Sequence, residues 1–205
     1  MLFSQNECAY KIKSDEKVIY DHDKHKIVQS AIGYYVMNTD LPFLDLDKPK
    51  WVPMWFHKIA TKRRVSRCLS HLDLDGRLYQ TAKGLRLMIT SKLLATDSAD
   101  FHELCQCLGC DKLYSRLCRH QKTYRARLTP KPTRIGVRQR RHAASWGMTE
   151  ELWDQDYFTA RDQYATCRLI ATFGKRIVPD FSEVVDTHDA WCGVHWEKID
   201  NRPIA

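Results

Sequence analysis

The sequence predicts an α+β fold with a ferredoxin-like, split β-α-β antiparallel core and an added C-terminal helical layer. Segments with strand and helix periodicity follow one another as strand, helix, hairpin, helix and strand, which is the order of a split β-α-β sheet. A hydrophobic fraction of 43% in 205 residues is sufficient for one folded core. We expect one domain, made of a polar lead-in (1–26), an α+β core (27–133), a basic loop (134–148) and a C-terminal helical extension (149–205).

The first half of the chain supplies a strand, a helix and a hairpin. Residues 27–37 are rich in β-branched and aromatic side chains and predict one buried strand. Pro42 and Pro49 predict an interruption of regular structure after it. Apolar residues at helical spacing predict a helix over 54–72, and a hairpin with its turn over 82–84 follows.

A capped helix and a basic strand come next. Asp97 or Ser98 is suited to cap a helix that Gly109 ends. Residues 123–128 alternate like a strand, with their arginines on one face and Tyr124, Ala126 and Leu128 on the other.

The C-terminal part is predicted to be mainly helical. Thr149, followed by two glutamates, predicts the start of the longest helix, which runs to about Phe173 and is stopped by Gly174. A short strand over 176–178 and a helix over 182–190 complete the prediction. His188 and Asp189 are neighbours on that helix, and adjacent helical residues do not face each other, so no catalytic pair is expected there.

One tract carries the whole positive excess of the chain. The sequence has 33 basic and 25 acidic residues and a formal net charge of +8. From Lys112 to Thr149 there is no aspartate or glutamate, and without the eleven basic residues of this tract the chain would hold 22 basic against 25 acidic. Such a field favours a phosphate-bearing partner, and arginine forks onto phosphate and stacks on bases. A solvated basic face is the alternative. The eleven are Lys112, Arg116, Arg119, Lys122, Arg125, Arg127, Lys131, Arg134, Arg138, Arg140 and Arg141.

The cysteines favour core packing over metal or disulfide chemistry. Cys105, Cys107, Cys110 and Cys118 fall on a helix-like pattern, whereas structural zinc usually requires two well-separated ligand pairs. Zinc is the less favoured interpretation, and Cys167 is interpreted as helix core. No stretch approaches the roughly 20 apolar residues that span a bilayer, and the first residues lack the apolar middle of a signal peptide. We therefore expect a cytoplasmic protein without a membrane partner or disulfides.

Three clusters have the composition of a functional site. Asp40, Asp45 and Asp47 follow the first predicted strand, and carboxylates two apart on an extended chain can share Mg²⁺, although aspartate near proline is also common in turns. Around the predicted hairpin turn, the hydroxyl of Thr81 and the positive charges of Lys83 and Arg86 suit phosphate binding. A plain solvent-facing turn is the alternative. The third cluster is the basic strand and the stiff, free Pro-Lys-Pro arm that is expected to project beyond it. The candidate phosphate-binding residues are Thr81, Lys83, Arg86, Arg125, Arg127, Lys131, Arg134, Arg138, Arg140 and Arg141.

These clusters, in this order, resemble the palm of the archaeo-eukaryotic primase and primase-polymerase superfamily. Such palms carry carboxylates after a first core strand, a hairpin whose small residue and glycine lead to a histidine, a later carboxylate and a basic strand. The resemblance implies that Asp40, with the two aspartates after it, forms the first motif and that Asp111 is the later carboxylate, so Asp40 and Asp111 become candidate catalytic residues. The Y-x-T-A-x-G-x-R and R-A-R-L-T-P-K-P segments also resemble a group of uncharacterised bacterial proteins.

Two departures from the superfamily pattern bear on catalysis. Arg86 occupies the place of the histidine, and Asn38 stands where the first of two alternating acids would fall. Nucleotidyl transfer in that superfamily uses two metal ions held by several carboxylates, and both changes would weaken that arrangement. The resemblance therefore favours a binding descendant at least as strongly as an active polymerase.

Taken together, the sequence predicts a protein that binds nucleic acid or nucleotide phosphate through the basic strand and loop of residues 112–149, as a non-catalytic relative of primase-like palms. DNA and RNA both fit this prediction. One alternative is a Mg²⁺-dependent primase or nucleotidyltransferase, and another is a component whose basic face docks on an acidic protein. The sequence establishes no cofactor; it is compatible with Mg²⁺, and zinc is not expected.

Overall fold

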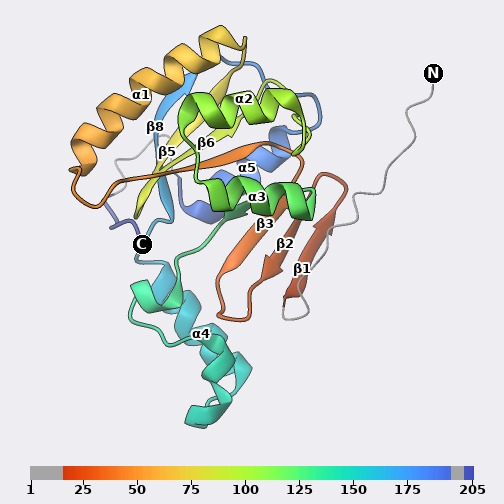
Figure 1. The fold of residues 1–205 in the computed structure, drawn as a ribbon. Helices are drawn as coiled ribbons and strands as arrows, with labels where there is room; N and C mark the ends of the chain where they lie inside the picture. Colours follow the sequence, from red (N-terminus) through yellow and green to blue (C-terminus); the bar gives the residue numbers. More distant parts are fainter. Residues whose placement is uncertain (1–15, 195–200) are drawn as a thin grey trace.

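The structure, a computed structural model that describes residues 16–194 and 201–205, contains two four-stranded sheets and five α-helices within those residues (Figure 1). The first sheet has the order β1 (Lys17–His22), β2 (His25–Gln29), β3 (Tyr35–Thr39), β7 (Tyr124–Arg127). The second has the order β4 (Phe43–Asp47), β6 (Gly84–Ile89), β5 (Gly76–Thr81), β8 (Cys167–Phe173). The helices are α1 (Met54–His71), α2 (Ala99–Leu108), α3 (Lys112–Gln121), α4 (Glu150–Arg161) and α5 (Ser182–Cys192).

The predicted α+β class is confirmed, and the second sheet contains a split β-α-β unit. Strands β4 and β5 are connected through α1, and each is antiparallel to β6, which lies between them, so β4 and β5 run parallel. The ferredoxin-like strand order is not completed in the described residues, because β8 pairs with β5 rather than with β4, and β1, β2, β3 and β7 form a separate sheet.

The segment expected to form one strand over 27–37 is a hairpin instead. Strands β2 and β3 are joined by a tight turn in which Gly33 N donates to the carbonyl oxygen of Ser30 at 2.8 Å. Gly33 has a φ of +105°, a backbone conformation that favours glycine. The expectation that Pro42 and Pro49 exclude regular structure is also wrong, because β4 fits between the two prolines.

The long C-terminal helix predicted over 149–173 is wrong beyond Arg161. Thr149 caps α4 as predicted, its side chain accepting from Leu152 N at 3.3 Å. The chain then forms β8, which pairs with β5 at the edge of the second sheet. Short apolar runs fit helix and strand templates alike, and the decision here comes from a partner strand far away in the sequence. The C-terminal segment thus contributes a strand as well as helices, and the strand predicted over 176–178 does not form.

Several local predictions are confirmed. Helix α1 covers the predicted 54–72, and the β5-β6 hairpin turns where expected. Ser98 caps α2 by accepting from Phe101 N at 3.2 Å, and Gly109 ends that helix in the left-handed conformation. In β7 the residues alternate between buried and half-buried, as the sequence pattern indicates.

The second sheet has one apolar face and one polar face. On β4, Leu44 and Leu46 alternate with Asp45 and Asp47, and successive strand residues point to opposite faces. Arg86 of β6 lies directly opposite Asp45 and so belongs to the polar face. Acidic and basic side chains therefore line one surface of a sheet whose other surface is packed with leucines.

Helices α1 and α5 cover opposite faces of this sheet (Figure 1). Lys58 of α1 donates to Gln80 Oε1 at 3.1 Å, whereas the neighbouring residue Tyr79 packs edge-to-face on His188 of α5, with ring centroids 4.9 Å apart. Because Tyr79 is paired with Arg86 across β5 and β6, the polar face is the one that α5 covers. Among the described residues, no helix combines the length and the apolar character needed to cross a bilayer.

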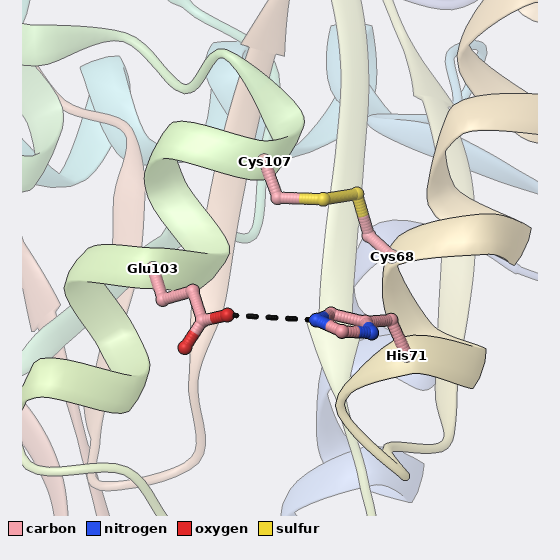
Figure 2. The surroundings of a disulfide bond; sticks show 4 residues. All are labelled: Cys68, His71, Glu103 and Cys107. Carbon is pink, nitrogen blue, oxygen red and sulfur yellow. Dashed lines mark ion pairs between the residues drawn. A yellow bond between two sulfur atoms is a disulfide. The ribbon is translucent and has the colours of Figure 1, made fainter.

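A disulfide joins the two helices that cover the apolar face. Cys68 of α1 is bonded to Cys107 of α2, with their Cα atoms 6.2 Å apart (Figure 2). His71 and Glu103 form an adjacent ion pair at 3.8 Å. The expectation of no disulfides is therefore wrong. The pairing depends on how α1 packs against α2, and the local cysteine spacing does not contain that information.

The disulfide also removes Cys107 from the group of four cysteines considered for zinc. Cys118 is buried, and Cys105 and Cys110 pack partly buried against the core. Core packing, the favoured interpretation, is confirmed for these three.

We expect Cys107→Ser to lower the free energy of unfolding by about 2–4 kcal/mol in oxidising buffer, because the disulfide restricts the unfolded chain. Cys107 is exposed, so the change leaves no cavity in the core. Urea denaturation of both proteins measures the difference. In excess reductant the two curves should coincide, and equal stability in oxidising buffer would contradict a formed disulfide.

Candidate functional site

A cavity of about 340 Å³ lies where the two sheets meet α3. Its walls come from β3, β4, β6, α3 and β7, together with the β5-β6 turn and the segment after β7. All three clusters singled out in the sequence contribute to it. The predicted site residues that line it are Asp45, Asp47, Thr81, Lys83, Arg86, Arg125, Arg127, Lys131 and Arg134.

The register of β4 and β6 sets the acidic wall. Asp45 and Asp47 lie two residues apart on β4, opposite Arg86 and Gly84 respectively. A Cβ atom on Gly84 would lie 2.4 Å from the carbonyl oxygen of Leu46, so only glycine allows the hairpin to approach β4 this closely. The turn is closed by Gly84 N, which donates to Thr81 Oγ1 at 3.2 Å. This turn carries Lys83 at the cavity.

Arg86 connects the two sheets beneath the cavity. Only 3% of the residue is exposed. Its Nε donates to Asp45 Oδ1 at 3.2 Å, and its Nη1 donates to the carbonyl oxygen of Arg127 on β7 at 2.9 Å. Burial by itself lowers the pKa of Arg86, but the charge of Asp45, together with those of Cys192, Cys167 and Tyr114, raises it above the ordinary value. Arg86 is therefore a permanently charged structural cation that also forms part of the cavity wall.

The arm after β7 is held by α4 rather than projecting into solvent. The hydroxyl of Tyr157 lies 2.7 Å from the carbonyl oxygen of Pro130 and 2.6 Å from Thr129 Oγ1. Thr129 Oγ1 in turn accepts from Tyr35 N on β3 at 2.9 Å. The expectation of a free Pro-Lys-Pro arm is wrong, and the anchoring places Lys131 in the cavity wall.

The basic wall is electrostatically crowded. Burial, Arg86 and Arg134 together lower the pKa of Arg127 to about 10. Burial and then the charges of Arg127, Arg134 and Lys83 lower the pKa of Lys131, and burial lowers that of Arg134. The Nε of Arg127 and the Nη1 of Arg134 are shielded from solvent and have no hydrogen-bond partner among the described residues. An anion in the cavity would reduce the repulsion among these basic side chains and would accept hydrogen bonds from the two unpaired donors.

The acidic wall holds two of the three aspartates expected to act together. Burial, Asp111 and Asp45 raise the pKa of Asp47, in that order of size. Asp111 caps α3, its Oδ1 accepting from Leu113 N at 2.9 Å, and its backbone N donates to the carbonyl oxygen of Asp45 at 3.3 Å. Asp40 precedes β4 at the other end of the strand and does not line the cavity. The carboxylates that approach one another are therefore those of Asp45, Asp47 and Asp111.

Three predicted phosphate ligands lie elsewhere. Arg138 packs over the Trp146 ring at 4.7 Å from its centroid. Arg140 pairs with Glu150 at 2.5 Å and with Asp154, which joins the basic loop to α4. Arg141 donates to a neighbouring histidine. None of these three arginines lines the cavity. Within the cavity, Arg125 is already paired with Glu16 at 2.6 Å.

Several cavity residues were not anticipated from the sequence. Glu16 belongs to the polar lead-in, and Tyr34 precedes β3, with Lys131 Nζ 5.8 Å from the centre of its ring. Helix α3 contributes Leu117 and Gln121. The helical spacing within α3 predicts an amphipathic helix, but nothing in the sequence indicates which cavity that helix closes.

Comparison with known proteins does not assign the chain to a family. The chain matches no protein-family model, no curated protein and no solved structure. Inference of a function therefore depends on the chemistry of the cavity itself.

We expect Lys131→Met to raise the free energy of unfolding of the ligand-free protein by about 0.5 kcal/mol near neutral pH, a small gain because solvent screens a half-exposed charge. The folded-state pKa of Lys131 lies below the ordinary 10.5. The wild type should therefore gain stability as pH rises towards 10.5, where its difference from the variant disappears. Denaturation curves across this range measure the effect, with Lys112→Met as an exposed control. A loss of stability in Lys131→Met would contradict the crowding.

Proposed function

We propose that the cavity binds the phosphate groups of a nucleotide or a nucleic acid. The observation that carries the proposal is the gathering of Lys83, Arg127, Lys131 and Arg134 around one cavity, with lowered pKa values for the last three. The cations of such a group repel one another, and an anionic ligand that binds among them would neutralise that repulsion. Two of the arginines have buried N–H groups to donate, and guanidinium-phosphate hydrogen bonds are among the stronger ones.

The opposite wall suits a divalent cation. Asp45 and Asp47 face the same cavity, and carboxylate oxygens are the ligands that Mg²⁺ prefers. The raised pKa of Asp47 reflects burial and repulsion from two other carboxylates, and a bound cation would relieve that repulsion. The donor set therefore fits one Mg²⁺, which would bridge the acidic wall to phosphate oxygens held by the basic wall.

The size of the cavity limits the ligand. About 340 Å³ is the range of small-molecule sites. It suits the phosphates of a mononucleotide or one end of a strand, and it does not suit a duplex. Tyr34 offers an aromatic face near Lys131, where a base could stack.

A second candidate is metal-dependent nucleotidyl transfer, which the closeness of Asp111 to Asp47 favours. Such transfer uses two metal ions held by several carboxylates. Asp45 is already engaged with a buried arginine at 3.2 Å, which reduces the negative charge available to a second ion. Binding without transfer is therefore the better-supported proposal.

We expect the double variant Lys131→Gln, Arg134→Gln to bind a fluorescent nucleoside triphosphate at least about tenfold more weakly, because it loses two charge-assisted contacts. Arg116→Gln, Arg119→Gln is the matched control, since both of these arginines are exposed and lie outside the cavity wall. Fluorescence anisotropy over a salt series measures both. Equal losses in the two doubles would indicate a diffuse basic face and contradict a phosphate site in the cavity.

We expect Mg²⁺ to strengthen nucleotide binding in the wild type and in Asp40→Asn but not in Asp47→Asn. Coordination requires the carboxylate form, and the pKa of Asp47 is raised. As the pH falls, the increase in nucleotide affinity caused by Mg²⁺ should therefore be lost at a higher pH than it would be with an aspartate of ordinary pKa. Titration calorimetry with and without Mg²⁺ at several pH values tests this. If Mg²⁺ still strengthens nucleotide binding in Asp47→Asn, Asp47 is not a ligand of the ion.

A further inference from the structure

A second cluster of reactive side chains lies on the polar face of the second sheet. Cys167 begins β8, and His188 and Cys192 are four residues apart on one face of α5. All three are buried, with exposures of 0% for His188 and 1% for each cysteine. Their ligand atoms lie within 4.8 Å of one another. The cavity just described does not include any of them.

One distance within the cluster matches that between two ligands of a tetrahedral ion. The distance from Cys192 Sγ to His188 Nε2 is 3.6 Å. Zinc-ligand distances of about 2.3 Å to sulfur and 2.0–2.1 Å to nitrogen place two such atoms roughly 3.6 Å apart at the tetrahedral angle. A soft donor set of two thiolates and one imidazole selects zinc over Mg²⁺ or Ca²⁺.

The carboxylate of Asp189 fixes the orientation of the His188 imidazole. His188 Nδ1 lies 3.0 Å from Asp189 Oδ1, and Asp189 Oδ2 pairs with Arg77 Nη2 at 2.5 Å. A carboxylate on the far nitrogen is the usual support of a metal-binding histidine, because it fixes the tautomer and turns the other nitrogen to the metal. The His188-Asp189 contact was not expected from the sequence.

The charges around the cluster balance with a divalent ion. Two thiolates and a neutral imidazole offset a charge of +2. The two nearby guanidinium groups are paired elsewhere, Arg77 with Asp189 and Arg86 with Asp45. The carbonyl oxygen of Arg127, which accepts from Arg86, lies 3.8 Å from Cys192 Sγ.

A thiol, an imidazole and a carboxylate in this order also occur at nucleophilic cysteine sites. The burial of His188 and Cys192 argues against that use here, since a substrate would have to reach atoms that solvent does not reach. Structural metal sites, by contrast, are closed.

We propose that Cys167, His188 and Cys192 bind a zinc ion that ties α5 to β8 beneath the phosphate cavity. Arg86 lies near enough to both cysteines to interact with them electrostatically, and it also holds the cavity wall together. The zinc site would thus stabilise the base of the cavity. The proposal does not depend on the ligand of that cavity.

The full-length protein, purified without chelator, should contain about one zinc per chain by mass spectrometry of the metals. Replacement of zinc by Co²⁺ should produce the visible bands of tetrahedral Co²⁺ and thiolate-to-cobalt charge transfer. Cys192→Ser should lose most of the metal, whereas Cys110→Ser, which changes a cysteine outside the cluster, should retain it.

The wild type alone is sufficient to overturn the proposal should Cys192→Ser fail to fold. Absence of zinc, together with no thermal shift and no thiolate-to-cobalt absorption on adding Zn²⁺ or Co²⁺, would show that the cluster is a hydrogen-bonded thiol-imidazole group. A Cys167-Cys192 disulfide, seen by mass spectrometry in protein purified without oxidant, would overturn it equally. Metal retained by Cys192→Ser would place the ion elsewhere.

Discussion

A buried guanidinium that must be satisfied from both sheets is the constraint on which this fold depends. Arg86 is 3% exposed, and burying an unpaired charge is prohibitively costly. Its partners are a carboxylate on β4 and a backbone carbonyl on β7, which belong to different sheets. Satisfying one side chain therefore fixes how the two sheets meet. That junction places the acidic wall opposite the basic one.

The polar face of the second sheet contains both proposed sites. At one end of it Asp45 and Asp47 face the cavity proposed to bind phosphate, and further along, under α5, lies the cluster of Cys167, His188 and Cys192. The leucine face is covered by α1 and α2, which the disulfide links. Both proposed sites thus lie on the surface that α5 covers, opposite the disulfide-linked helices.

The sequence is most informative where local signals decide the structure. The caps of α2 and α4, the turn before Gly84 and the alternation of β7 are all predictable from neighbouring residues. The strand β8, the Cys68-Cys107 bond and the wall formed by α3 depend on partners distant in the sequence, which no local pattern specifies. The same holds for the candidate site. Residue type identifies its charged members, but only the register separates Asp45 and Asp47 from Asp40, and Arg127 and Lys131 from Arg138 and Arg140.

The most direct test of the central claim is a crystal structure with a non-hydrolysable nucleoside triphosphate and Mn²⁺, whose anomalous scattering locates the metal. We predict phosphate density against Arg127, Lys131 and Arg134, with the manganese peak between the phosphates and Asp47. Phosphate density on the outer loop at Arg138 and Arg141, with the cavity unchanged, would contradict the account.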